Sequence, residues 1–188
     1  MKIYFTSTPR GKKEFSQNFA SIHQVIEKLS HQHVHDFINQ TDDYYYSSNH
    51  QLLTSHYKNS LANLKKADVA VFEASTHSLG VGFLINKALE FNKPTIVLYV
   101  SGRRPVLLEG AENDRLQMIE YHLKNLEPVL KEALEIAQEN LDIRFNFFIS
   151  PRHDRFLNWI ATAKKLPRAV YLRRLIDQDI KKYKDFPG

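Results

Sequence analysis

Two short, almost wholly apolar runs in the first two thirds of the chain constrain the fold more than any other feature. Residues 68–74 read Asp-Val-Ala-Val-Phe-Glu-Ala, and residues 94–100 read Pro-Thr-Ile-Val-Leu-Tyr-Val. A strand that lacks alternation between polar and apolar residues is buried on both faces, which is typical of the centre of a parallel sheet. The chain is therefore expected to build a sheet that helices cover on both sides.

The segments around these runs alternate between strand and helix patterns. Three more strands are predicted at residues 2–6, 34–38 and 116–121. Amphipathic patterns predict helices at residues 14–29, 52–66 and 124–141, and a further helix that opens from the loop 75–82 and runs to residue 91. This alternation indicates an α/β fold, a doubly wound and mainly parallel five-stranded sheet with flanking helices. Ligands of such sheets bind at the carboxyl ends of the strands, so we expect one pocket among the loops 6–13, 75–82 and 101–110.

The last quarter of the chain follows a different pattern. Residues 143–149 alternate as a strand does, and Ser150 followed by Pro151 is typical of a helix start. Two helical runs follow, separated at residues 164–168. One strand and two short helices cannot bury this much apolar surface, and a lone strand has two open edges. We therefore predict two domains, residues 1–141 and residues 142–188, of which the second pairs with another copy.

Strand, helix and helix at these lengths resemble the ribbon-helix-helix family of DNA-binding domains. In that family two chains pair their strands into a ribbon that enters the major groove. The resemblance implies that Arg144, Asn146 and Phe148 face the groove. It also implies a homodimer, and a phosphate held at the start of the second helix by the amide groups near Pro167, Arg168 and Ala169. The shared core of the dimer would hold Phe145, Phe147, Ile149, Leu175 and either Trp159 or Ile160.

The distribution of charge bears on this interpretation. Residues 143–188 contain 11 Lys and Arg against 4 Asp and Glu, about +7, whereas the rest of the chain contains 15 against 17, about −2. A basic unit beside a nearly neutral domain is what nucleic-acid binding predicts. The alternative is a dimerisation unit that never touches DNA.

The first domain carries a second resemblance, which spans about residues 1–141. It is similar to the nucleoside 2-deoxyribosyltransferase family, and closest to the branch that hydrolyses deoxynucleoside 5′-monophosphates. The similarity rests on Ala67-Asp-Val-Ala-Val-Phe-Glu-Ala74, on Ser78-Leu-Gly-Val-Gly-Phe83, on the opening Met1-Lys-Ile-Tyr-Phe5, on Arg10-Gly11 and on Ala88-Leu-Glu-Phe-Asn-Lys93.

The chemistry of that family needs a glutamate nucleophile just after the glycines, because the reaction passes through a glycosyl-enzyme. This chain has Leu84 at the matching position, and Ser60 where the family has an aspartate on the preceding helix. Glu73, at the end of a strand, is a weak candidate for a base or a ribose ligand, and Glu90 lies nearly two turns beyond the nucleophile position. The resemblance therefore predicts a catalytically silent domain.

The phosphate-binding part of the family's site is matched better. Hydroxyl groups, backbone amides at a helix start and an arginine suit a 5′-phosphate. The resemblance assigns this role to the first turn and the glycine loop, at Thr8, Pro9, Arg10, Gly11, Ser78 and Gly80. The alternative is that these residues are ordinary turn residues that serve folding.

These patterns predict a DNA-binding transcriptional regulator whose silent first domain senses a nucleotide or a similar small ligand. One alternative is an active nucleoside or deoxynucleotide N-glycosidase, or a 2-deoxyribosyltransferase, with a displaced nucleophile. Another is a scaffold in which neither site works.

No cofactor and no metal are expected. His31, His33 and His35 alternate, but no carboxylate or cysteine joins them at metal-ligand spacing. No apolar run approaches 18 residues, so no membrane span is expected. The absence of cysteine fits a cytoplasmic protein.

Overall fold

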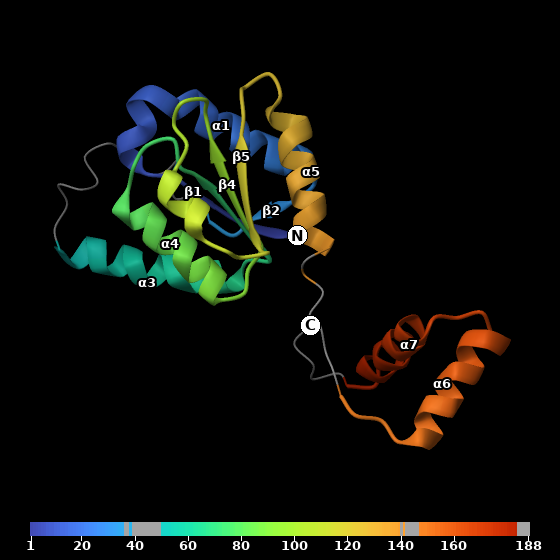
Figure 1. The fold of residues 1–188 in the computed structure, drawn as a ribbon. Coiled ribbons are helices and arrows are strands. Elements are labelled where there is room, and N and C mark those ends of the chain that lie inside the picture. The colour runs from blue at the N-terminus through green and yellow to red at the C-terminus, as the bar shows by residue number, and fades with distance from the viewer. Residues whose placement is uncertain (36–37, 39–49, 140, 142–146, 184–188) are drawn as a thin grey trace. The chain divides into compact units, whose positions relative to one another are not determined.

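The computed structural model describes residues 1–35, 38, 50–139, 141 and 147–183. The chain divides into two compact units, Met1–Ile143 and Arg144–Gly188. Each unit is described by itself (Figure 1). Among the described residues, no helix combines the length and the apolar character that crossing a lipid bilayer requires.

The first unit is built on one sheet of five parallel strands in the order β2-β1-β3-β4-β5. The strands are β1 (Lys2–Thr6), β2 (Gln32–His33), β3 (Val69–Glu73), β4 (Thr95–Tyr99) and β5 (Leu116–Glu120). Every residue of β3 and β4 is buried, as their apolar runs predict. The predicted α/β class and parallel five-stranded sheet are confirmed.

The second strand differs from its prediction. The apolar spacing of residues 34–38 suggests a strand there, of which residues 36 and 37 lie outside the described residues. The strand that the structure shows, β2, is the two-residue segment before it, with Gln32 opposite Lys2 and His33 opposite Ile3. Val34 still donates its N–H to the carbonyl of Ile3 at 2.9 Å. Pairing with β1 thus decides the position of this short edge strand.

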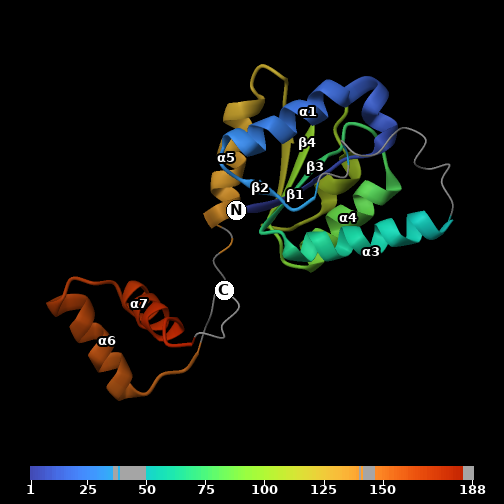
Figure 2. The same ribbon diagram turned by 180° about the vertical axis from the view of Figure 1, so that it is seen from behind.

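Helices cover both faces of the sheet (Figures 1 and 2). On one face α1 (Lys12–Lys28) and α5 (Leu126–Glu139) pack against Ile3 and Phe5 of β1. On the other face α3 (His50–Lys66) and α4 (Leu79–Glu90) share a core with Tyr4. Successive residues of β1 therefore enter different cores, as the geometry of a strand requires. Two short 3₁₀ helices, η1 (Pro9–Gly11) and η3 (Val106–Gly110), lie in the loops after β1 and β4.

The second unit contains two helices, α6 (Pro151–Ala163) and α7 (Arg168–Ile180). The hydroxyl group of Ser150 caps α6 by accepting the N–H of His153 at 3.4 Å, as the Ser-Pro pair predicts. The predicted strand is only partly described. Residues 143–146 lie outside the described residues, and residues 147–149 form no strand.

Candidate functional site

The sheet has a topological switch point between β1 and β3. These strands are neighbours at the centre of the sheet. The helix that follows β1 covers one face, and the helix that follows β3 covers the other. In open α/β sheets this divergence leaves a crevice at the carboxyl ends, which is where ligands bind. Residues 7–11 and 74–78 follow the two strands and line this edge of the sheet.

Glu73 is the last residue of β3 and is completely buried there, at 0% exposure. Its carboxylate accepts the hydroxyl and the N–H of Ser75 on Oε1. The Ser7 hydroxyl donates to the Glu73 carbonyl at 2.8 Å and lies 3.3 Å from Oε2. The Tyr121 hydroxyl lies 3.5 Å from Oε1. Residues after β1, β3 and β5 thus surround one acid.

Burial and hydrogen bonding act on the pKa of the Glu73 carboxyl group in opposite directions. Burial raises the pKa of the Glu73 carboxyl group, and the hydrogen bonds that it accepts oppose the rise. Burial also raises the pKa of the Tyr121 hydroxyl, and the neighbouring carboxylate adds to that rise. Tyr121 itself accepts a hydrogen bond from the Asn18 side chain at 3.0 Å. A raised pKa makes the ionised carboxylate a stronger base than that of an exposed glutamate, which suits a general base.

A cavity of about 310 Å³ lies beside the start of α4. Its polar lining includes Ser78, His77 and Arg104, and its apolar lining includes Val81 and Ile85 of α4. Residues 105–108, in and just before η3, form a further part of the wall. Ala74 and Thr76 line the cavity, but Glu73 does not. The acid therefore lies behind the wall of this cavity.

The first of the two segments that the resemblance assigns to a phosphate lies close to the loop after β3, at Thr76. A Cβ atom added to Gly11 would lie 2.8 Å from Oγ1 of Thr76, in the loop after β3. Thr8 is buried, and its backbone carbonyl accepts the N–H of Gly11 at 2.9 Å. Pro9 is buried as well, whereas Arg10 is exposed. Ser78 caps α4 by accepting the N–H of Val81 at 3.4 Å, and Gly80 is exposed in the first turn.

The two positions that match the family's carboxylates lie on α3 and α4. Leu84 packs into the core between these helices and the sheet. Ser60 is buried, with its hydroxyl oxygen 3.2 Å from Nε2 of His56, one turn earlier on α3. Burial lowers the pKa of His56 to about 4, with the charge of His35 as a smaller cause. His56 is thus neutral at pH 7 and can accept a hydrogen bond from the Ser60 hydroxyl group. Only the i, i+4 spacing could have indicated this pair from the sequence.

The residues predicted to contact DNA all belong to the second unit, and only part of them lies in the described residues. Arg144 and Asn146 lie outside the described residues, and Phe148 is fully exposed. Pro167 precedes α7, and Ala169 is exposed in its first turn. The guanidinium group of Arg168 is bound to α6, through Asp154 at 2.9 Å and the side chain of Asn158. Its charge is therefore already paired within the unit.

Comparison with known proteins concerns the first unit's fold. No model of a known protein family matches the chain. A mouse protein, 5-hydroxymethyl-dUMP N-hydrolase, is 27% identical over 140 residues, which are 71% of this chain and 79% of that protein. The solved structure of Clostridium botulinum CMP N-glycosidase, BcmB, has 16% identity and a TM-score of 0.50, and the match covers 71% of this chain and 99% of that chain. The matched part of the chain shares the fold of that N-glycosidase.

An N-glycosidase fold corrects the prediction of function. The chain was expected to be a DNA-binding regulator with a catalytically silent sensor domain, but the similar proteins are an N-hydrolase and an N-glycosidase. This relationship contradicts the regulator and favours the enzymatic alternative. Neither the comparisons nor the described residues support DNA binding, transcription regulation or a ribbon-helix-helix unit.

Proposed function

We propose that the chain hydrolyses the N-glycosidic bond of a nucleoside 5′-monophosphate and releases the base. The observation that carries this proposal is the buried Glu73 carboxyl group at the switch point of an N-glycosidase fold. The similarity to a mouse 5-hydroxymethyl-dUMP N-hydrolase supports a nucleotide as the substrate.

The shape of the site suits a mononucleotide. Its cavity of about 310 Å³ lies at the lower end of the roughly 300–1,000 Å³ that small-molecule sites occupy. We propose that the 5′-phosphate binds between the turn at residues 8–11, which carries Arg10, and the start of α4, where Ser78 and Gly80 lie. The base would then lie against the apolar wall formed by residues 105–108.

Glu73 is the proposed displaced carboxylate, because Leu84 and Ser60 carry no acid. A water molecule attacks the anomeric carbon while the bond to the base breaks, and the electron pair of that bond leaves with the base. The proton of the water passes to the Ser7 hydroxyl, whose own proton passes to the Glu73 carboxylate 3.3 Å away. Because Glu73 is buried and outside the cavity lining, this geometry suits direct attack by water rather than a glycosyl-enzyme.

The proposal is tested by incubating the full chain with deoxyribonucleoside and ribonucleoside 5′-monophosphates and measuring free base by chromatography. We expect base release from at least one monophosphate, faster than from the matching nucleoside without phosphate. Glu73→Gln should lower the rate by roughly 10²–10⁴-fold, the usual contribution of a general base. Glu90→Gln, which changes an exposed acid at the end of α4, is the matched control and should retain the rate.

Two results would contradict the proposal. Base release that is equal in the wild type and in Glu73→Gln removes Glu73 from the reaction. Exchange of a labelled free base into the nucleotide indicates a glycosyl-enzyme, and hence a transferase, because direct attack by water leaves no sugar intermediate to capture the base.

A further inference from the structure

A cluster of three metal-ligand side chains lies where α1 meets the edge strand β2. His23 and Glu27 are one turn apart on α1, and His33 is the last residue of β2. One ligand atom from each side chain lies within 4.8 Å of the other two. The rings of His23 and His33 stack at 3.7 Å between centroids, with 7° between their planes. Nδ1 of His23 lies 3.7 Å from Oε1 of Glu27.

The fold brings these side chains together. A metal ion lies in the plane of each imidazole that binds it, so one of the two stacked rings must rotate before both can bind one ion. The i, i+4 spacing puts His23 and Glu27 on one side of α1. The pairing of His33 with Ile3 of β1 fixes the strand beneath the helix. Nε2 of His33 lies 3.2 Å from the carbonyl oxygen of His23, and a proton on Nε2 can be donated to that oxygen. This hydrogen bond leaves the lone pair on Nδ1, and such a second hydrogen bond orients most metal-binding histidines.

The ligand set indicates the kind of ion. Two imidazoles and one carboxylate are the protein ligands of many zinc sites, whereas magnesium and calcium prefer oxygen ligands alone. We propose that His23, Glu27 and His33 bind one divalent transition-metal ion of the zinc class, with a coordination position left for water. The side chain of His23 is 17% exposed, and that of Glu27 is 60% exposed. An ion bound between them would therefore be accessible from solvent on the side of Glu27.

This site is separate from the proposed hydrolysis of nucleotides and does not depend on it. A metal bound there would connect a two-residue edge strand to α1 through side-chain bonds. An ion that binds only the folded chain stabilises it in proportion to the logarithm of the ion concentration above Kd. A metal ion at this site would therefore stabilise the edge of the sheet, and the gain in stability can be measured without any enzymatic activity.

The test uses the full chain stripped of metal with a chelator. We expect Zn²⁺ to bind at one equivalent in isothermal titration calorimetry at pH 7.5, and to raise the melting temperature where Mg²⁺ does not. Co²⁺, used as a spectroscopic probe, should give the visible absorption of a low-coordinate nitrogen and oxygen site. His33→Gln and His23→Gln should weaken Zn²⁺ binding by more than the roughly 10–100-fold that loss of an outer-shell partner costs.

Two variants make the result decisive. His122→Gln removes an exposed histidine in the loop after β5 and should bind Zn²⁺ as the wild type does, which separates this site from adventitious binding by the nine histidines. Glu27→Gln changes an exposed side chain, so it should fold even if a histidine variant does not. Wild-type Zn²⁺ affinity and an unchanged Co²⁺ spectrum in Glu27→Gln, or equal affinities in His33→Gln and His122→Gln, would overturn the proposed site.

Discussion

At the scale of single residues, Glu73 links folding to pH. Burial raises the pKa of its carboxyl group, so over a range of pH the folded chain keeps a proton that the unfolded chain has released. The folded state then binds more protons than the unfolded state, and stability falls as pH rises. The contribution is fully present below the carboxyl pKa of the unfolded chain and is lost as pH rises through the raised pKa of the folded chain.

Replacing this acid should remove that dependence. We expect Glu73→Gln to unfold in urea with a midpoint that changes less than that of the wild type between pH 5 and pH 8, because glutamine has no proton to release. The wild type should be more stable, relative to the variant, at pH 5 than at pH 8. Circular dichroism during urea titration measures both midpoints. Equal shifts in the two proteins would mean that Glu73 is ionised in the folded chain over this whole range, as it is in the unfolded chain, and would contradict the raised pKa. Glu90→Gln should follow the wild type.

At the scale of elements, two glycines near the proposed phosphate site face very different surroundings. A Cβ on Gly11 would lie 2.8 Å from Oγ1 of Thr76 and 3.1 Å from Cζ of Phe19, which is buried in the core. A Cβ on Gly82, in the second turn of α4, would meet no heavy atom within 4 Å. The close approach of the loop after β1 to the loop after β3 thus depends on Gly11.

The two alanine variants should therefore differ in sign. Gly11→Ala should lower the free energy of unfolding by about 1–3 kcal/mol, the usual cost of overpacking. Gly82→Ala should raise it by up to about 1 kcal/mol, because alanine is the better helix former. Urea unfolding at one pH measures both. A Gly11→Ala variant as stable as the wild type would show that Thr76 rotates away at no cost, and that the two loops are not tightly packed.

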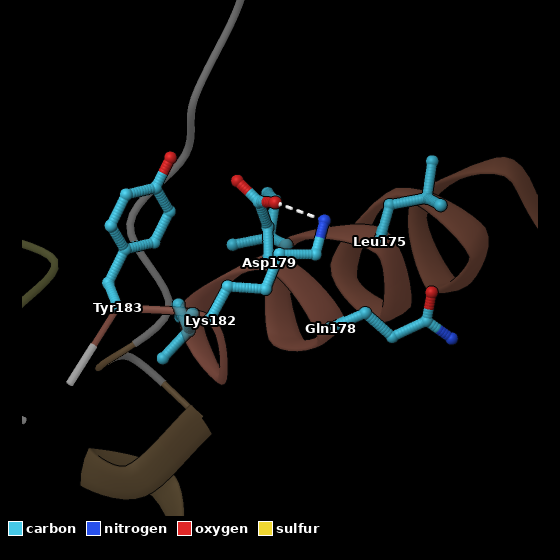
Figure 3. Close-up of a pocket in the computed structure, with 7 residues that line it drawn as sticks. Leu175, Gln178, Asp179, Lys182 and Tyr183 are labelled. Atoms are coloured by element: carbon cyan, nitrogen blue, oxygen red, sulfur yellow. Dashed lines mark hydrogen bonds and ion pairs between the residues drawn. The ribbon is translucent and has the colours of Figure 1, made fainter.

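At the scale of the whole molecule, the second unit leaves much apolar surface uncovered. In the described residues 147–183, only Leu157 and Ile160 among the large apolar side chains are buried, whereas Trp159 is 51% exposed. A depression of about 540 Å³ is lined by the C-terminal half of α7 and by residues just after it. Figure 3 shows Leu175 and Tyr183 in this depression, with the ion pair of Lys182 and Asp179 between them. A domain of this size rarely folds with so small a core.

We accordingly expect this unit to pair with a second copy of itself. The wild type should sediment as a dimer at micromolar concentration in analytical ultracentrifugation. Ile176→Asp, which puts a charge on the apolar face of α7, should shift the chain toward monomer. Ala169→Asp adds the same charge at the exposed start of α7 and should leave the assembly unchanged. A monomeric wild type at this concentration would rule out self-pairing as the cover for these side chains.

The sequence by itself determined the α/β class and predicted the edge of the sheet at which a ligand should bind. Continuous apolar runs such as residues 68–74 are stable only where both faces of a strand are covered, so a central parallel strand was the natural prediction. Parallel strands also bring their carboxyl ends to one edge of the sheet, so the loops after β1 and β3 could be expected to meet. The missing acids at Leu84 and Ser60 were visible as well, but their meaning for function was not.

Only the tertiary structure decided which side chains act together. Glu73 lies in a run without alternation, so no local pattern indicates that Ser7 and Tyr121, at the ends of other strands, surround it. The His23, Glu27 and His33 cluster joins a helix to a strand, whereas the alternation of His31, His33 and His35 suggested no such partner. Local periodicity reports whether a segment is buried. Contacts between segments depend on the pairing order of the strands and on which face each helix covers, and these follow from the packing of the whole chain.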